Sequence, residues 1–283
     1  MRKTLFSVLI SILFVGNSYC QDIASAARSG NFANTLTNGG YLEVGAGATY
    51  RNLSRLNIKE DEAAGIGIFI GGEYRYEGFF LEAAQGTADG LNLGYNFYNG
   101  NGFSVDILAS SLSGRNTGRD NDIGENLSEQ ALNRALRDQD SLYNGAGIRL
   151  TAFQPDDNRI YQLRLVSDIH DNNGFQATFR TSKTRQYRNW NFHTIFSLGY
   201  LSSDTADYFF GVDEVEATKR FPEFKPSSAW TIGAEAGVTY PLSENWVFRS
   251  TLRVGRYSGD IEDSPFITGK GSFSFTTFFT YVF

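Results

Sequence analysis

The last residues of the chain constrain its fold more than any other stretch. Gly271–Phe283 reads GSFSFTTFFTYVF, with aromatic side chains at every second position except 277 and mostly small or polar ones between them. This period of two indicates a β-strand with one aromatic face. An exposed aromatic edge strand would aggregate in water. The pattern therefore predicts the final strand of a transmembrane β-barrel, with lipid on the aromatic face and a neighbouring strand on the edge.

Residues 1–20 have the features of a secretory signal peptide. Arg2 and Lys3 precede an apolar run, Leu5–Val15, and small residues at positions 18 and 20 allow cleavage before Gln21. The alternative is a lipid anchor on Cys20, the only cysteine, but the three residues before it are unlike a lipidation signal. We expect a mature protein without cysteine or disulfides.

Composition and charge narrow the class of protein. Removing Arg2 and Lys3 from the 25 basic residues leaves 23 against 31 acidic ones, so we expect no nucleic-acid partner. The chain has 30 glycines, 24 phenylalanines and 15 tyrosines but one methionine, which favours strands and turns over helices. The slightly negative mean hydropathy is compatible with a membrane barrel, because only alternate strand residues face lipid.

Alternating segments recur along the chain from residue 39. We expect residues 21–38 to form a periplasmic N-terminal segment and 39–283 an antiparallel all-β barrel of about twelve strands. The predicted strands are 40–50, 65–74, 78–86, 90–98, 102–111, 145–154, 159–168, 174–183, 190–202, 229–240, 246–257 and 272–283. A soluble β-sandwich or water-soluble barrel is the alternative.

The connections between these strands fall into two classes. Those after even-numbered strands are short, and the odd-numbered ones are mostly long: 51–64, 112–144, 203–228 and 258–271. Such segregation is typical of an outer-membrane barrel of a Gram-negative bacterium, with periplasmic turns, extracellular loops and both termini in the periplasm. Its outer wall would contact outer-membrane lipid and lipopolysaccharide. Aromatic residues at strand ends suit interfacial girdles: Tyr41, Tyr98, Trp190, Tyr200, Trp230, Tyr240 and Trp246.

Alternation also predicts which charged residues face the lumen. The acids predicted to face inward are mainly on strands 1 to 5: Glu43, Glu73, Glu82, Asp106 and Glu235. The arginines predicted to face inward are on strands 6, 7, 8 and 11: Arg149, Arg164, Arg180, Arg249 and Arg253. The two walls could pair across a narrow lumen and plug it. Alternatively, water could fill the lumen and leave a field that guides ions. Because the opposite charges are equal in number, we favour pairing.

The chain offers little for catalysis or metal binding. His170 follows Asp168 in a turn-like segment, and a paired His and Asp could activate water. His193 has lumen parity, where structural hydrogen bonding is the simpler interpretation. Loop acids such as Asp260 could bind calcium, but they lack EF-hand order. We expect no catalytic residues, no metal site and no cofactor. In loop 112–144, residues 126–136 have the spacing of a short amphipathic helix.

The last third of the chain resembles the MipA/OmpV family of outer-membrane proteins. The resemblance rests on four segments and the closing strand: Phe209–Val212, Phe221–Pro226, Leu242–Trp246 and Gly259–Phe266. It implies a barrel without known enzymatic activity. It also implies a scaffold that holds a periplasmic lytic transglycosylase near a murein synthase; other members are described as porin-like or adhesive.

These observations lead to one main functional hypothesis and two alternatives. The main one is a non-enzymatic scaffold for peptidoglycan-remodelling enzymes, docking on the 21–38 segment and on the periplasmic turns, including Tyr76, Tyr187 and Arg188. The first alternative is a porin-like channel for small solutes, acidic ones included, with Arg249 and Arg253 as selectivity elements. The second is an adhesin that uses loops 112–144 and 203–228.

Overall fold

The computed structural model describes most of the barrel. The described residues are 22–29, 38–52, 62–83, 90–100, 102–111, 144–169, 174–214, 217, 219, 221–257, 259–265, 267 and 271–283. The predicted signal peptide, most of loop 112–144 with its predicted helix, and His170 lie outside these ranges. Within them, every helix is too short or too polar to cross a membrane.

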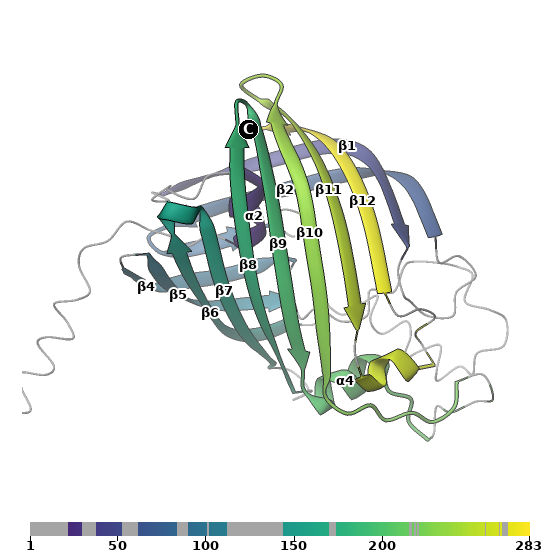
Figure 1. Ribbon diagram of the computed structural model, residues 1–283. Helices are drawn as coiled ribbons and strands as arrows, with labels where there is room; N and C mark the ends of the chain where they lie inside the picture. Colours follow the sequence, from purple (N-terminus) through teal and green to yellow (C-terminus); the bar gives the residue numbers. More distant parts are fainter. Residues whose placement is uncertain are drawn as a thin grey trace, which may run out of the picture.

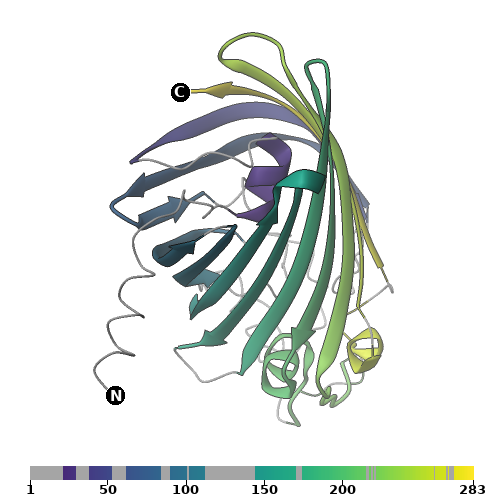
Figure 2. The ribbon, with the colours of Figure 1, turned by 60° about the vertical axis from the view of Figure 1, so that its left-hand side comes forward.

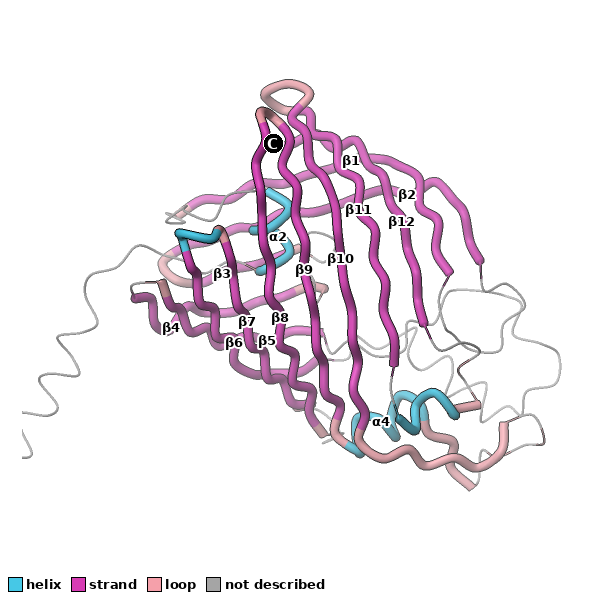
Figure 3. Tube along the Cα trace, viewed as in Figure 1, coloured by secondary structure: helices cyan, strands magenta, loops and turns pink. Residues whose placement is uncertain are grey.

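Twelve antiparallel strands close into one barrel, which confirms the predicted fold (Figures 1 and 3). Each strand pairs with its neighbours in the sequence, and β1 pairs with β12. The strands are β1 Gly39–Asn52, β2 Glu62–Tyr76, β3 Phe79–Glu82, β4 Asn92–Gly100, β5 Phe103–Ser111, β6 Asn144–Gln154, β7 Arg159–Asp168, β8 Phe175–Tyr187, β9 Trp190–Leu201, β10 Ala229–Pro241, β11 Trp246–Tyr257 and β12 Gly271–Val282.

The C-terminal strand closes the barrel as its alternation predicted. β12 pairs with β1 from Glu43 opposite Val282 to Asn52 opposite Phe273, and with β11 on its other edge. Phe273, Phe275 and Phe279 are exposed on the outer wall. Both edges of the strand are therefore paired, and its aromatic face lies on the outside of the barrel, as a lipid-facing strand requires.

Strand boundaries differ from the predicted ones chiefly at β3 and β8. β3 ends at Glu82, before the predicted residue 86, and β8 continues to Tyr187. The β8 extension follows from the turn: Arg188 adopts φ 52°, which allows residues 188–189 alone to connect β8 to β9. The β8–β9 and β10–β11 hairpins consequently project together at one end of the barrel (Figure 1).

The N-terminal segment departs from the prediction. Ile23–Ser29 forms helix α2, which lies inside the barrel against β7–β10 and not outside it as a lead-in (Figure 2). Asp22 caps the helix, because its Oδ1 accepts hydrogen bonds from the backbone N–H groups of Ala24 (2.9 Å) and Ser25 (3.3 Å). Tyr41 is not a girdle residue, since its hydroxyl is 2.9 Å from Oγ of Ser25 in α2.

The opposite end of the barrel carries an apolar cluster. Helix α4, Ser203–Phe210, is capped by Ser202, and its Phe209 and Phe210 are buried together with Ile261 from the 3-10 helix η2, Gly259–Asp263. Ser264 donates a hydrogen bond of 2.7 Å to the carbonyl of Phe210. The two long connections after β9 and β11 are thus packed against each other.

Candidate functional site in the barrel lumen

The first group of interior charges, here the β3–β6 cluster, comprises Glu82, Asp106 and Arg149. Nη1 and Nη2 of Arg149 lie 2.8 and 2.9 Å from the two carboxylate oxygens of Glu82, and its Nε lies 2.7 Å from Oδ2 of Asp106. All three side chains are buried. One arginine therefore serves two carboxylates in planar, charge-assisted geometry.

Polar neighbours complete this cluster. The side-chain amide of Asn92 donates to Glu82 at 2.9 Å, and that of Asn96 donates to Asp106 at 2.8 Å. Asn96 occupies a register irregularity between β4 and β5, which aims its amide at the cluster. The Phe80 ring lies 4.9 Å from the Arg149 guanidinium carbon. A buried charge group satisfied to this degree is expected to be rigid.

Glu73 extends the cluster through Arg75. The Arg75 guanidinium contacts Glu73 and reaches Oε1 of Glu82 at 3.5 Å. Arg75 was not among the predicted lumen charges, because we placed it in the turn after β2. The strand continues to Tyr76 and turns the Arg75 side chain inward.

The second group, here the α2 latch, joins the N-terminal helix to the wall. Arg28 of α2 donates from Nε and Nη2 to the carboxylate oxygens of Glu235 on β10, at 2.9 and 2.8 Å. Glu235 also accepts from Nε of Arg253 at 2.6 Å and lies 3.0 Å from Nε2 of His193. The side-chain amide of Asn191 donates to the Ala27 and Arg28 carbonyls at 2.9 and 3.1 Å. Side chains from α2, β9, β10 and β11 thus meet at one carboxylate.

Glu43 and Arg249 form a third interior pair. Nη2 of Arg249 lies 2.8 Å from Oε1 of Glu43, and Nη1 contacts the other oxygen. The two residues stand on β1 and β11, on either side of β12. The pair therefore spans the closing strand.

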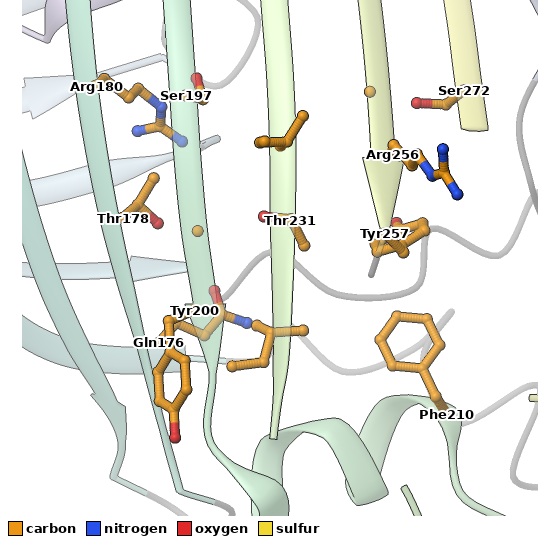
Figure 4. Close-up of a pocket in the computed structure, with 14 residues that line it drawn as sticks. Gln176, Thr178, Arg180, Ser197, Tyr200, Phe210, Thr231, Arg256, Tyr257 and Ser272 are labelled. Carbon is orange, nitrogen blue, oxygen red and sulfur yellow. The ribbon is translucent and has the colours of Figure 1, made fainter. Parts of the chain in front are cut away.

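Arg164 and Arg180 are also buried inside the barrel. Arg164 lies opposite Arg149 in the β6–β7 register and donates to the Ser110 hydroxyl. Arg180 borders an interior cavity of about 200 Å³, together with Ser197, Thr231, Tyr257 and Phe210 of α4 (Figure 4). This cavity combines two arginines, hydroxyls and three aromatic rings.

The pairs do not form by two charged walls meeting across the lumen. Asp106 and Arg149 are direct neighbours in the β5–β6 register, and Glu235 and Arg253 are direct neighbours in the β10–β11 register. The ion pairs run along the wall, and the group that enters the lumen is α2. Arg28 carried no period-two signal, so sequence reasoning missed it; the available signal was Asp22 before an alanine-rich run.

The histidine inside the barrel has a structural environment. His193 is buried, with Nε2 on Glu235, and within the described residues no three His, Cys, Asp or Glu side chains gather as a metal site. Asp260 instead accepts from the backbone N–H and the hydroxyl of Ser227, at 3.1 and 2.6 Å, which hold the pKa of its carboxyl below the ordinary value.

The predicted docking residues occupy two separate places. Tyr76 is exposed at the end of β2, whereas Tyr187 and Arg188 are exposed at the tip of the β8–β9 hairpin. β2 and β8 lie on opposite sides of the strand order. The guanidinium carbon of Arg188 lies 5.5 Å from the Tyr187 ring centroid, so these two side chains act as one unit.

Comparisons with known proteins agree with this architecture. The sequence matches the family described as MltA-interacting protein MipA over residues 37–283. It is 22% identical to the outer membrane protein OmpV of Vibrio cholerae over 75% of this chain and 76% of that protein. It is also 22% identical to the outer membrane protein Omp26La of Vibrio anguillarum, over 64% and 67%.

Solved outer-membrane structures are similar at lower levels. The channel DcaP of Acinetobacter baumannii is 9% identical with a TM-score of 0.38, covering 86% of this chain and 96% of that one. An anion-selective porin of Comamonas acidovorans is 8% identical with a TM-score of 0.38, covering 87% and 99%. Because the family match spans the whole barrel, the chain belongs to the MltA-interacting protein MipA family of outer-membrane β-barrels.

Proposed function

We propose that the protein is a non-enzymatic scaffold that docks peptidoglycan-remodelling enzymes at the short-turn end of its barrel. The observation that carries this proposal is the α2 latch, because a helix fixed inside the lumen by Arg28 and Glu235 opposes passage of solutes. The family description as MltA-interacting supports a lytic transglycosylase as the partner, with a murein synthase as the second protein. In this proposal the short turns and both termini face the periplasm.

The docking surface we favour is the pair of projecting hairpins. Tyr187 and Arg188 are exposed at the β8–β9 tip, and Leu242 and Trp246 are exposed beside the β10–β11 turn. Aromatic and arginine side chains are the usual anchors of protein interfaces. Residues 22–29 no longer belong to this surface, because they are held in the lumen, and Tyr76 is a separate contact.

A binding experiment with purified components tests this surface. The signal-free protein in detergent would be titrated with a purified MltA-type lytic transglycosylase. The double variant Tyr187→Ala/Arg188→Ala should weaken binding about tenfold or more, since each anchor typically contributes over 1 kcal/mol. Lys225→Ala, at the opposite end of the barrel, is the control. Equal binding by both variants would refute the proposed docking surface. No binding by the unaltered protein would refute the scaffold proposal.

A small-solute channel is the second candidate, favoured by the cavity beside Arg180 and by the small residues of the opposite wall. A Cβ at Gly65 or Gly67 would meet no atom of the described residues within 4 Å, so open space borders β2 there. Arg253 keeps half of its side chain exposed despite its bond to Glu235. Conductance in planar bilayers should then show open steps, with ion selectivity altered by Arg249→Gln and Arg253→Gln. A silent bilayer with folded protein would exclude this candidate.

A further inference from the structure

The outer wall is hollowed near its short-turn end. A depression of about 400 Å³ crosses β7 to β11. Along its middle, one row of the sheet register runs through Arg159, Lys183, Thr194, Ala236 and Leu252. The two-residue alternation directs these side chains to the same outward face. The hollow therefore begins at two cations and continues over small and apolar residues.

The apolar part of the hollow has the shape of a trough. Ala234 and Ala236 of β10 form its floor, while the larger Phe196, Leu252 and Val254 border it. These three bordering side chains are exposed on the outer wall. In an outer-membrane barrel the surrounding medium is lipid, so an extended acyl chain is the natural occupant of such a trough.

The charged end of the hollow has more positive than negative groups. Arg159 and Lys183 share one carboxylate, Asp157, which lies 3.0 Å from Nε of Arg159 and contacts Nζ of Lys183. Arg185 lies two residues beyond Lys183 on the same face, is exposed, and has no ion pair within the described residues. The acid Asp156 belongs to the same turn but does not line the hollow. Arg159 and Lys183 thus share one carboxylate, and Arg185 adds a third cation on the same face.

Cations on a lipid-facing wall are costly unless they reach the interface or an anionic group. The neighbouring strands supply aromatic side chains at this level: Trp190 and Tyr240 have ring centroids 4.6 Å apart, and Trp190 and Phe192 stack at 6.4 Å. Arg185 lies opposite Phe192 in the register. The basic residues therefore interrupt an aromatic belt at the depth where lipid phosphates lie.

We propose that this hollow is a binding site for one glycerophospholipid of the leaflet at the short-turn end. Its phosphate contacts Arg159, Lys183 and Arg185, and one acyl chain lies over Ala234 and Ala236. The positive charge of the three cations favours the anionic phosphate, and the single trough has room for one acyl chain. The proposal uses the periplasmic orientation of the short turns, because that leaflet of an outer membrane holds phospholipid.

Native mass spectrometry of the signal-free protein in detergent tests the site. Phosphatidylglycerol would be added at increasing concentration, with diacylglycerol and lipopolysaccharide as separate additions. We expect one saturable phosphatidylglycerol per barrel and an apparent Kd about tenfold higher in Lys183→Gln/Arg185→Gln. Arg256→Gln, an exposed arginine near the other end, should leave the Kd unchanged. Ala236→Leu should displace the acyl chain, whereas Ala48→Leu on the outer wall of β1 should not.

The outcomes separate the sources of binding. Equal occupancy by diacylglycerol would show that the phosphate is not recognised, and preferential occupancy by lipopolysaccharide would assign the site to the other leaflet; either result overturns the proposal. Unchanged phosphatidylglycerol binding in the double variant would also overturn it. Heat-modifiable migration of each variant in gels confirms that its barrel is folded. None of these results depends on binding of a lytic transglycosylase, so failure of the scaffold proposal is distinguishable.

Discussion

Replacing Arg28 with alanine should release α2 from the barrel lumen. Arg28 makes two bonds to Glu235, at 2.9 and 2.8 Å, and both side chains are about one-tenth exposed. A hydrogen bond to a charged group contributes about 1.5–3 kcal/mol. Because Arg253 and His193 remain on the carboxylate, we expect the variant to lose about 2–3 kcal/mol of docking free energy. A helix of seven residues has almost no stability of its own, so undocking should also unfold it.

A thiol reporter in α2 measures this release. The protein without residues 1–20 has no other cysteine, and Ser25→Cys places a thiol on the helix, where the native side chain is buried. A loss of about 2–3 kcal/mol should raise the rate of labelling by a bulky, water-soluble reagent about 30- to 150-fold. Single-channel recordings should show open steps that the unaltered protein lacks.

Arg253→Ala is the matched control. It removes another partner of the same Glu235 carboxylate but makes no bond to α2 in the structure, so labelling should rise far less. An equal increase in both variants would mean that α2 is held by the general charge balance of the lumen. No increase in Arg28→Ala would mean that packing against the wall alone holds the helix. The hypothesis that the Arg28–Glu235 pair holds α2 would then be wrong.

Two further predictions concern stability. Glu82→Gln should destabilise the barrel by about 3–5 kcal/mol, because it leaves Arg149 as a buried cation with a weakened network; denaturant unfolding in liposomes measures this. At the turn, bonds from Lys183 and then Arg159 hold the pKa of Asp157 below its ordinary value. A depressed pKa gives stability that is present above the unfolded value and lost as pH falls through the folded one. The difference in melting temperature between the natural protein and Asp157→Asn should therefore shrink as pH falls below about 4.

The barrel was predictable because apolar and polar residues alternate along each strand, and this alternation shows which face meets lipid. In β12, the alternation of phenylalanine with serine and threonine specified both the strand and its position as the closing element. Parity also placed Glu82, Asp106 and Arg149 inside. The alternation shows which face a side chain is on, but not which partner it reaches. Arg149 pairs with Glu82 three strands away, and this depends on barrel curvature and on the length of the arginine side chain.

The N-terminal helix was not predictable by the same reasoning. Ile23–Ser29 is too short for a reliable helical period, and its position depends on contacts with distant residues such as Asn191 and Glu235. Tyr41 shows the same limit: an aromatic residue at a strand end suggested a lipid interface, but its inward parity and the hydroxyl of Ser25 place it against α2.

The strength of the latch decides between a scaffold and a channel. If the two Arg28–Glu235 bonds alone held α2, their roughly 2–3 kcal/mol would leave about 1–3% of the molecules with α2 free. The bonds from Asn191 and the packing against the wall lower that fraction further, so the lumen would be closed at rest at its short-turn end. A ligand that opens the barrel must then bind the undocked state at least 30-fold more tightly than the docked one. A partner bound at the β8–β9 and β10–β11 hairpins could bias the same equilibrium, because Asn191 and Glu235, which hold α2, stand on β9 and β10. Measuring thiol labelling of α2 with and without a bound lytic transglycosylase would therefore show whether docking and opening are coupled. If a saturating partner leaves the labelling rate unchanged, then partner docking and closure of the lumen by α2 are independent properties of the barrel.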